Sequence, residues 1–291
     1  MAAPILRWIG GKRAQAKALA KEFFEVLTLT GGRFVEPFMG SASIALALAE
    51  LGYPADQMRL SDGLDSLIEL YHALQIYPKE TIEAFADLGE EAKRARPKRL
   101  YAELRAELNS ARRQQSLIPR PRIGVLFLYL NAAGFNGVIR ENKRGDFNNA
   151  RGETGQKLPS KGAILDFARA IRGASIRRRD FEGAISEARE GDLVYCDPPY
   201  DGTFTSYSTD WRPSDQERLA KALKDATRRG VWIYASNAST ERIRGLYGSF
   251  CEVRERAIDW QVGGTKERRK KATELLLIGR PRTAAQLAFQ P

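Results

Sequence analysis

The stretch that decides the fold of this chain reads Gly191-Asp192-Leu193-Val194-Tyr195-Cys196-Asp197-Pro198-Pro199-Tyr200. Its first six residues predict a short buried strand, because the centre of the run is apolar, β-branched or aromatic. The two prolines end the strand, since proline cannot donate a ladder hydrogen bond and fixes φ. We therefore expect an acid, two rigid residues and an aromatic ring at the carboxyl end of a strand, where open α/β sheets bind ligands. A tight turn without further function explains an isolated motif of this kind equally well.

Size and composition exclude several classes of protein. The chain has 291 residues, of which 43% are hydrophobic, enough for one large domain or two modest ones. No apolar run approaches the ~20 residues of a membrane span, and the N-terminus lacks the layout of a signal peptide. The two cysteines, Cys196 and Cys251, predict no disulfide framework and fit a reducing cytosol. The single histidine, His72, excludes a histidine-rich metal site, and we expect no metal.

The charge of the chain indicates a polyanionic partner. The formal net charge is +11 and the pI is near 9.7, which points to nucleic acid or an anionic membrane. From Lys93 to Arg122 there are ten Lys and Arg residues against two acids. Charged runs are usually solvated faces, but a surplus of this size in one block favours nucleic acid.

The N-terminal part of the chain predicts a cofactor-binding βα unit. A strand over 33–38 leads through the small-residue turn 39–43 into an Ala- and Leu-rich helix. The second strand, 57–61, ends in Asp62, about 20 residues past Gly40, the separation at which an acid commonly binds ribose hydroxyls. No G-x-G-x-x-G occurs, so a dinucleotide is disfavoured.

The middle of the chain differs in composition from both ends. Residues 72–160 predict a helical, basic insertion, while 1–71 and 161–291 predict one α/β domain with a mostly parallel sheet and an antiparallel edge. In the insertion, leucines at helical spacing face a small core, and the arginines, among them Arg105, Arg112 and Arg113, are expected to face outward.

A β-hairpin is expected near residues 135–150. Asn136-Gly137 and Arg144-Gly145 are turn signals, and Arg140 lies between them. A two-stranded ribbon with an exposed Arg fits a major groove, where Arg pairs bidentately with guanine. A surface hairpin with solvated charges is the commoner interpretation of such a segment.

The residues after the buried strand suit chemistry on a planar amine. The exocyclic amine of adenine is a poor nucleophile because its lone pair is delocalised. Two acceptors in line with its N–H bonds, here the Asp197 carboxylate and the Pro198 carbonyl, would favour a more tetrahedral nitrogen in the transition state. Tyr200 can stack on the ring, and a base from a duplex would have to be flipped out to reach it. A mechanism in which Asp197 acts as an ordinary general base is less attractive, because a protonated aromatic amine intermediate is costly. Cys196 is expected in the core.

Five stretches in this order together resemble the DNA adenine methyltransferase (Dam) family, the S-adenosylmethionine-dependent D12 class. They span nearly the whole chain and are Leu6–Lys12, Val35–Gly40, Phe135–Gly152, Val194–Tyr200, and Gly263–Thr265 with the basic residues that follow. The resemblance implies a Rossmann-like α/β sheet that binds S-adenosylmethionine, and a helical target-recognition domain over 72–160 with the hairpin near 135–150.

The resemblance also implies roles for individual residues. The target adenine would be held by Asp197, Pro198, Pro199 and Tyr200. S-adenosylmethionine would be bound by Trp8, Gly10, Gly11, Lys12, Pro37, Phe38, Gly40, Ser41, Asp62 and Asp197. DNA would be contacted by Arg7, Asn136, Arg140, Asn142, Lys143 and Arg144.

The chain departs from the family pattern at three positions. Ala42 replaces a second glycine in the turn, and Leu64 replaces an Asn two residues after Asp62. We expect cofactor binding to survive both changes. Ala150 stands where family members that read GATC tend to have Pro. Strict GATC specificity is therefore in question, and a different or relaxed DNA sequence preference stays open.

The expected function is methyl transfer to adenine N6 in double-stranded DNA. We expect the enzyme to be a monomer, encoded by a bacterium or a phage, that acts in the cytoplasm. Roles in restriction-modification, phage protection or regulation are all compatible with the sequence. Two alternatives stay open: a methyltransferase of the same fold acting on RNA, cytosine N4 or a protein glutamine amide, and an inactive DNA-binding relative.

Overall fold

The computed structural model describes residues 2–8, 10–113, 121–142, 144–152, 158–202, 211–261 and 269–281. Its helices are α1 (Ala16–Thr30), α2 (Ser43–Glu50), α3 (Asp65–Ile76), α4 (Pro78–Arg94), α5 (Pro97–Arg113), α6 (Pro121–Ala133), α7 (Lys161–Ala170), α8 (Phe181–Ser186), α9 (Pro213–Arg228) and α10 (Glu241–Tyr247). Two 3₁₀ turns occur at Ala55–Gln57 and Phe135–Gly137. The strands are β1 (Phe34–Glu36), β2 (Met58–Asp62), β3 (Ser175–Arg178), β4 (Leu193–Cys196), β5 (Trp232–Ala238), β6 (Glu252–Gln261) and β7 (Arg269–Gly279).

The strands form a seven-stranded sheet in the order β3-β2-β1-β4-β5-β7-β6. β4 pairs in parallel with both β1 and β5, whereas β7 is antiparallel to β5 and to β6. The sequence-based expectation of a Rossmann-like α/β sheet with an antiparallel edge is therefore confirmed. The strand order reverses between β1 and β4, and such a reversal is where open α/β sheets bind their ligands.

By its contacts the chain divides into two compact units. The first comprises Met1–Phe24, Met39–Met58 and Asp62–Arg178, and the second comprises Glu25–Phe38, Arg59–Ser61 and Arg179–Pro291. The division into a domain over 1–71 and 161–291 and a recognition domain over 72–160 remains an interpretation of the sequence.

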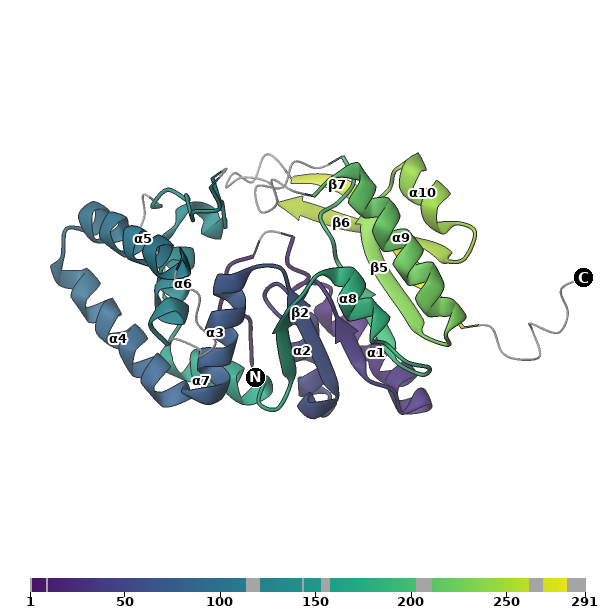
Figure 1. Cartoon of the computed structure of the whole chain (residues 1–291), viewed down its shortest axis with the longest axis horizontal. Helices are drawn as coiled ribbons and strands as arrows, with labels where there is room; N and C mark the ends of the chain where they lie inside the picture. The colour runs from purple at the N-terminus through teal and green to yellow at the C-terminus, as the bar shows by residue number, and fades with distance from the viewer. Residues whose placement is uncertain are drawn as a thin grey trace, which may run out of the picture. The chain divides into compact units, whose positions relative to one another are not determined.

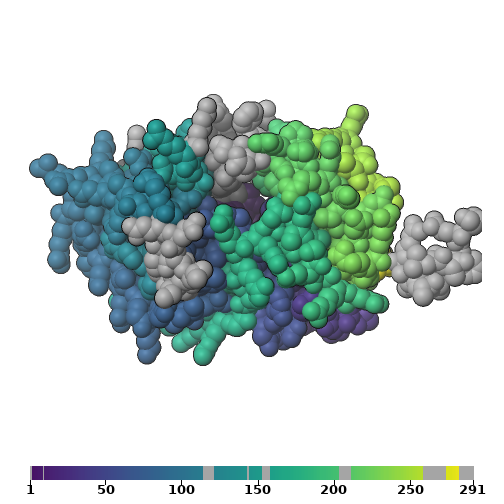
Figure 2. Space-filling view, viewed as in Figure 1, coloured from purple at the N-terminus to yellow at the C-terminus, as the bar shows by residue number. Residues whose placement is uncertain are grey.

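The first unit is built on helix α6. Residues Ile123–Ala132 of this helix are buried, and α3, α4 and α5 pack against it (Figure 1). Gly124 permits the close packing of α3, because a Cβ on it would lie 2.8 Å from the Leu70 Cα. Figure 2 shows α4 and α5, in blue, at the surface of this unit. None of the helices in the described ranges is long and apolar enough to cross a membrane.

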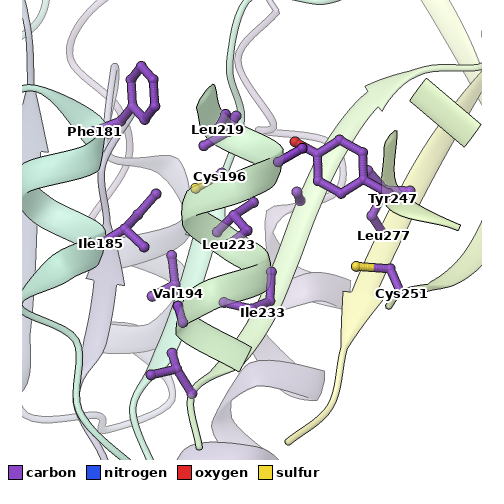
Figure 3. Packing of buried hydrophobic residues seen from close by; sticks show 14 of the residues in the cluster. Phe181, Ile185, Val194, Cys196, Leu219, Leu223, Ile233, Tyr247, Cys251 and Leu277 are labelled. Carbon is purple, nitrogen blue, oxygen red and sulfur yellow. The ribbon is translucent and has the colours of Figure 1, made fainter. Parts of the chain in front are cut away.

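The second unit has its own core, to which α8, α9 and α10 contribute apolar side chains. Val194, Cys196 and Ile233 of the central strands pack against Leu219 and Leu223 of α9, as Figure 3 shows. Cys196 lies in this core as expected, and burial raises the pKa of its thiol well above the usual value. Burial of apolar residues on both faces of β4 therefore fixes the strand that carries Asp197 at its end.

The start of β4 is fixed by a partly buried ion pair between Asp192 and Arg33. The Asp192 carboxylate accepts the main-chain N–H of Arg33 at 2.8 Å and pairs with the Arg33 guanidinium at 2.6 Å. Gly32 lies directly against the Gly191 carbonyl, where a Cβ would not fit. This contact holds the entry of β1 beside the entry of β4.

The start of α9 differs from the sequence-based expectation. The run Ser214–Glu217 is a capping-box pattern with the helix expected from Asp215. In the structure the helix begins at Pro213, and the Asp215 carboxylate accepts the Arg212 main-chain N–H at 2.7 Å. Proline is well suited to the first helical position, since its N–H would have no helical partner there.

Candidate active site

Two loops of the second unit flank the point where the strand order reverses. Pro37 and Phe38 follow β1, and Asp197 follows β4. Because β1 and β4 are parallel neighbours, their carboxyl ends meet at one edge of the sheet. The Phe38 ring stacks on Phe181, with centroids 5.6 Å apart, and meets the Trp211 ring edge-on at 5.7 Å.

The last residue of the Asp197–Tyr200 segment, Tyr200, has its hydroxyl group held by a hydrogen bond. The Tyr200 Oη donates a hydrogen bond to the Glu274 carboxylate, which is 1% exposed on β7. Burial, followed by the charges of Asp197 and Glu274, raises the pKa of Tyr200 well above its usual value. The phenol therefore stays neutral and presents an uncharged ring.

Two buried amide side chains hold the main chain around Tyr200. Gln216 of α9 donates from Nε2 to the Pro199 carbonyl at 2.8 Å. The Asn237 Oδ1 accepts the main-chain N–H of Asp201 at 3.1 Å. The two side chains also bind each other, because Asn237 Nδ2 donates to Gln216 Oε1 at 3.1 Å.

Asp201 ties the same loop to the start of α10. Its Oδ2 accepts from the Thr240 hydroxyl at 2.9 Å, and its Oδ1 accepts from Arg242 Nη1 at 3.4 Å. The loop that follows β4 is thus bound to α9, β5, α10 and β7 by polar side chains. We conclude that its geometry is set by the second unit as a whole.

In the first unit, Gly40 lies between an acid and an indole. Its main-chain N–H donates to Asp62 Oδ2 at 3.1 Å, and its carbonyl accepts from the Tyr71 hydroxyl at 2.8 Å. A Cβ built on Gly40 would lie 2.7 Å from Trp8 Nε1, so only glycine permits this approach. The structure thereby brings together Trp8, Gly40 and Asp62 from three separate stretches of sequence.

Asp62 is a carboxylate with a perturbed pKa. Its Oδ1 accepts the Leu64 main-chain N–H at 3.0 Å, in addition to the bond from Gly40. Burial raises the pKa of Asp62 to about 6, although the hydrogen bonds from main-chain N–H groups act in the opposite direction. A desolvated acceptor of this kind suits hydroxyl donors on a ligand.

The segment from Gly10 to Lys12 forms a turn at the start of α1. Gly10 has a φ of +72°, and the Gly11 N–H donates to the Trp8 carbonyl at 3.2 Å. A Cβ on Gly11 would be 3.6 Å from Ser41 Oγ, which places this turn beside the 39–43 turn. Lys12 is 8% exposed, so this residue is largely shielded from solvent.

Ala42 adopts a conformation that favours glycine. Its φ is +57° and its ψ is +28°, in the left-handed region, and its side chain is fully buried. This conformation gives a physical reason for the glycine that the resemblance implies at this position. The neighbouring Ser41 Oγ lies 2.9 Å from Ser43 Oγ.

Arg7 lies against the segment that follows α6. The fully buried Asn131 accepts the Arg7 N–H at 2.9 Å and donates to the Arg7 carbonyl at 2.9 Å. Its Nδ2 also donates to the Gly137 carbonyl at 3.0 Å. A Cβ on Gly137 would clash with the Arg7 side chain at 2.2 Å. Two regions expected to contact DNA are therefore joined by one asparagine.

The segment from Gly134 to Arg151 doubles back on itself through two antiparallel bridges, Gly134↔Arg151 and Glu141↔Phe147. The expected two-stranded ribbon is therefore not formed by the described residues of this segment, whose two halves are joined by single bridges and by side chains. Asn142 closes the turn, because its Oδ1 accepts the main-chain N–H groups of Arg144 at 2.8 Å and of Asp146 at 3.0 Å. Arg140, Arg144 and Asn136 are exposed.

Helix α5 supports this segment by an ion pair that sequence reasoning missed. The expectation that Arg112 faces outward is wrong: its side chain is 16% exposed and pairs with Glu141 at 2.5 Å. The reason is that an acid of the doubled-back segment lies opposite this face of the helix. Arg113 is exposed as expected, and it too reaches that segment, at Asp146 Oδ1 2.9 Å away.

Two further side chains of α5, Asn109 and Arg105, add to this support by hydrogen bonds to main-chain groups. Asn109 accepts the Phe147 N–H at 2.7 Å and donates to the Phe147 carbonyl at 3.0 Å. Arg105 Nη1 donates to the Asn149 carbonyl at 3.3 Å. Residues 105, 109 and 112 lie on one face of the helix at helical spacing, which is the signal that could have revealed this contact.

Some expected features lie outside the described residues. They are Lys143 and the Gly263–Thr265 stretch with the basic residues that follow it. Within the described ranges, no group of three or more His, Cys, Asp or Glu side chains could hold a metal ion.

Gln216, Asn237 and Glu274 were missed as site residues. The sequence marks Gln216 only as part of a helix start and Asn237 only as the end of a strand. Glu274 directly precedes the apolar run Leu275–Ile278 in β7, and a carboxylate next to such a run was the available signal.

Comparison with known proteins agrees with the resemblance seen in the sequence. A family model described as D12 class N6 adenine-specific DNA methyltransferase matches residues 8–261. The retron Ec67 DNA adenine methylase of Escherichia coli is 32% identical over 275 residues, covering 94% of this chain and 90% of that protein. The DNA adenine methylase of Salmonella typhi is 30% identical over 288 residues, 96% of each chain. Type II methyltransferase M1.LlaDCHI of Lactococcus lactis subsp. cremoris is 28% identical over 284 residues, 94% of each.

Proposed function

Because the chain belongs to the D12 class of N6 adenine-specific DNA methyltransferases, we propose that it transfers a methyl group from S-adenosylmethionine to N6 of a flipped adenine in duplex DNA. The observation that carries the proposal is the Asp197-Pro198-Pro199-Tyr200 segment. It follows β4, at the reversal of strand order, and its main chain is held on both sides of Tyr200.

The residues of the first unit fit S-adenosylmethionine by their chemistry. Asp62 offers a partly buried carboxylate for ribose hydroxyls, and the buried residue Lys12 offers an ammonium for a carboxylate. Trp8 offers an aromatic face next to Gly40. Gly10, Gly11 and Ser41 would complete this group within the same unit. When bound, the cofactor supplies an electrophilic methyl group.

The chain's own residues would make the adenine amine nucleophilic. Asp197 would accept a hydrogen bond from one N–H of the amine and the Pro198 carbonyl would accept one from the other, which favours a tetrahedral nitrogen in the transition state. The nitrogen would gain the methyl group as the bond from that group to sulfur breaks, and would then release one of its protons to the Asp197 carboxylate. The Pro199 carbonyl already accepts from Gln216, so Pro198 is the better second acceptor. Tyr200 stacks on the ring, and its raised pKa keeps the phenol uncharged beside the base.

We assign target recognition to the segment around Arg140. Arg140 is exposed, which suits bidentate pairing with guanine in the major groove. Arg7, Asn136 and Arg144 would contact DNA beside it, as would Lys143, while Asn142 shapes the turn. The alanine at position 150 favours a preference other than strict GATC. The surplus of positive charge predicts an affinity that falls steeply with salt.

The proposal is tested by incubating the purified protein with labelled S-adenosylmethionine and unmethylated duplex DNA, followed by mapping of the modified bases. We expect label on adenine N6 at a defined set of sequences. Label on cytosine, or only on RNA or protein added in parallel reactions, would replace the proposed substrate with an alternative. Cofactor binding without transfer to any substrate would identify an inactive DNA-binding relative.

A further inference from the structure

We propose that Gln216 and Asn237 are positioning residues that clamp the main chain on both sides of Tyr200. The inference rests on the proposed function, because it gives the Tyr200 ring the role of a stacking surface for the target base. Neither residue belongs to the Asp197–Tyr200 motif, and neither is expected to touch the base.

The clamp has two arms joined to each other. One arm is Gln216 Nε2, which donates to the Pro199 carbonyl at 2.8 Å, on the peptide group before Tyr200. The other arm is Asn237 Oδ1, which accepts the Asp201 N–H at 3.1 Å, on the peptide group after Tyr200. Asn237 Nδ2 donates to Gln216 Oε1 at 3.1 Å, so movement of one arm requires movement of the other.

Burial makes this clamp difficult to replace by water. Gln216 and Asn237 are each 1% exposed. Asn237 Oδ1 accepts a second N–H, from Ala238 at 2.8 Å, which fixes the direction of its amide. A buried amide that loses its hydrogen-bond partner destabilises the protein, because no hydrogen bond then offsets the free-energy cost of removing the amide from water. The arms therefore favour one position of the loop rather than a range of positions.

The tyrosine ring has a third fixed point at its far end. The Tyr200 hydroxyl donates to Glu274, which is buried on β7. β7 is paired with β5 in a register that places Glu274 opposite Ala238, next in the chain after Asn237. Fixing the main chain and the hydroxyl together leaves the ring one orientation. A stacking surface of this kind is ready before the base arrives, and a displacement of about 1 Å can cost about a hundredfold in rate.

The test is Gln216→Met, which keeps the length of the side chain and removes its donor. We expect kcat to fall about 10- to 100-fold, with KM for DNA and for S-adenosylmethionine within about threefold of wild type. The matched control is Gln75→Met, because Gln75 Nε2 likewise donates to main-chain carbonyls, of Ile171 at 2.8 Å and Ala174 at 2.9 Å. The control should retain wild-type kcat, and equal losses in both variants would overturn the proposal.

A double-mutant cycle separates positioning from a structural role. In a Tyr200→Ala background the clamp has no ring to position, so Gln216→Met should lower kcat less than about threefold further. A structural role would give the same factor in both backgrounds, and that result would refute the inference.

Gln216→Glu is a second test, to be used if the Gln216→Met variant does not fold. Its neutral carboxyl can donate to Pro199 and accept from Asn237, whereas its carboxylate has no donor. Its kcat relative to wild type should therefore rise as pH is lowered. A ratio independent of pH would contradict the clamp.

Amide hydrogen exchange separates this inference from the proposed function. The Asp201 N–H should exchange at least about tenfold faster in Asn237→Ala than in wild type, because its acceptor is removed. If wild-type protein transfers no methyl group while this amide is deprotected in the variant, the clamp exists and the proposed function is wrong. Unchanged exchange would overturn the clamp itself.

Discussion

The Asp62 carboxylate accepts the main-chain N–H of Gly40 at 3.1 Å, so the acid at the end of β2 holds a turn 22 residues earlier in the chain. Burial outweighs this hydrogen bond and raises the pKa of Asp62 to about 6. In the proposed function the same carboxylate binds ribose hydroxyls, which requires its ionised form. Protonation of one residue therefore competes with cofactor binding.

Cofactor affinity should depend on pH through Asp62. The carboxyl is ionised above about pH 6, and below that value its proton must leave before the oxygens can accept hydroxyl donors. We expect the Kd for S-adenosylmethionine, measured by calorimetry, to be flat above about pH 6 and to rise towards tenfold per unit below it. Asp62→Asn should bind weakly at all pH values without this inflection. An inflection that survives in the variant would assign it to another group.

Replacement of Ala42 by glycine should stabilise the protein. An L-residue in the left-handed region costs about 1 kcal/mol relative to glycine, and Ala42 has a φ of +57°. Ala42→Gly should raise the free energy of unfolding in denaturant titrations by about 1 kcal/mol and leave methyl transfer unchanged. The control is Ala47→Gly inside α2, which should lower that free energy by about 1 kcal/mol. If both substitutions lower the free energy of unfolding, the claim that the backbone of Ala42 is strained would be wrong.

Removal of the Asp197 carboxylate should abolish methyl transfer. Asp197→Ala takes away one of the two proposed acceptors for the amine, and we expect kcat to fall by at least about a thousandfold. Single-turnover rates with radiolabelled cofactor measure this step. Asp225→Ala is the control, since Asp225 forms an exposed pair with Arg228 on α9 and should leave the rate unchanged. A substantial residual rate in Asp197→Ala would refute the two-acceptor mechanism.

Arg140 should determine sequence preference more than rate. Loss of a bidentate contact to guanine costs about 1–3 kcal/mol of discrimination at one position. Arg140→Ala should therefore broaden the set of methylated sites, as read by sequencing of modified DNA. Arg122→Ala provides a control, because Arg122 pairs with Glu107 at 2.8 Å on the helices. Unchanged preference in Arg140→Ala would show that another segment reads the base.

The ion pair between Arg112 and Glu141 should hold the recognition segment in place. Arg112→Ala leaves the Glu141 charge without its partner next to Arg140, so site preference should broaden and the amides of 140–148 should exchange faster. Glu141→Gln in the same chain removes that charge and should restore part of the preference. If the factor by which the double variant loses site preference equals the product of the factors in the two single variants, the two residues do not act together.

The order of strands and helices was accessible to sequence reasoning because each element carries a local signal. The apolar run before Asp197, the small-residue turn after β1 and the acid at the end of β2 each follow from propensity and spacing. The packing of Arg112 against Glu141 was not accessible, because the two residues are separated by 29 positions and meet only when α5 lies beside the doubled-back segment. The left-handed φ of Ala42 was likewise invisible, since alanine carries no sequence signal for that conformation.

The sequence by itself determined the strand that ends at Asp197-Pro198-Pro199-Tyr200, and the family to which the chain belongs. Both depend on residue types at fixed spacing along one stretch of chain. Only the tertiary structure decided what holds Tyr200 in place. Gln216 comes from α9, Asn237 from β5 and Glu274 from β7, and no periodicity links them. They converge because burial of the apolar core packs α9 onto the sheet, and buried polar groups must then find partners with one another.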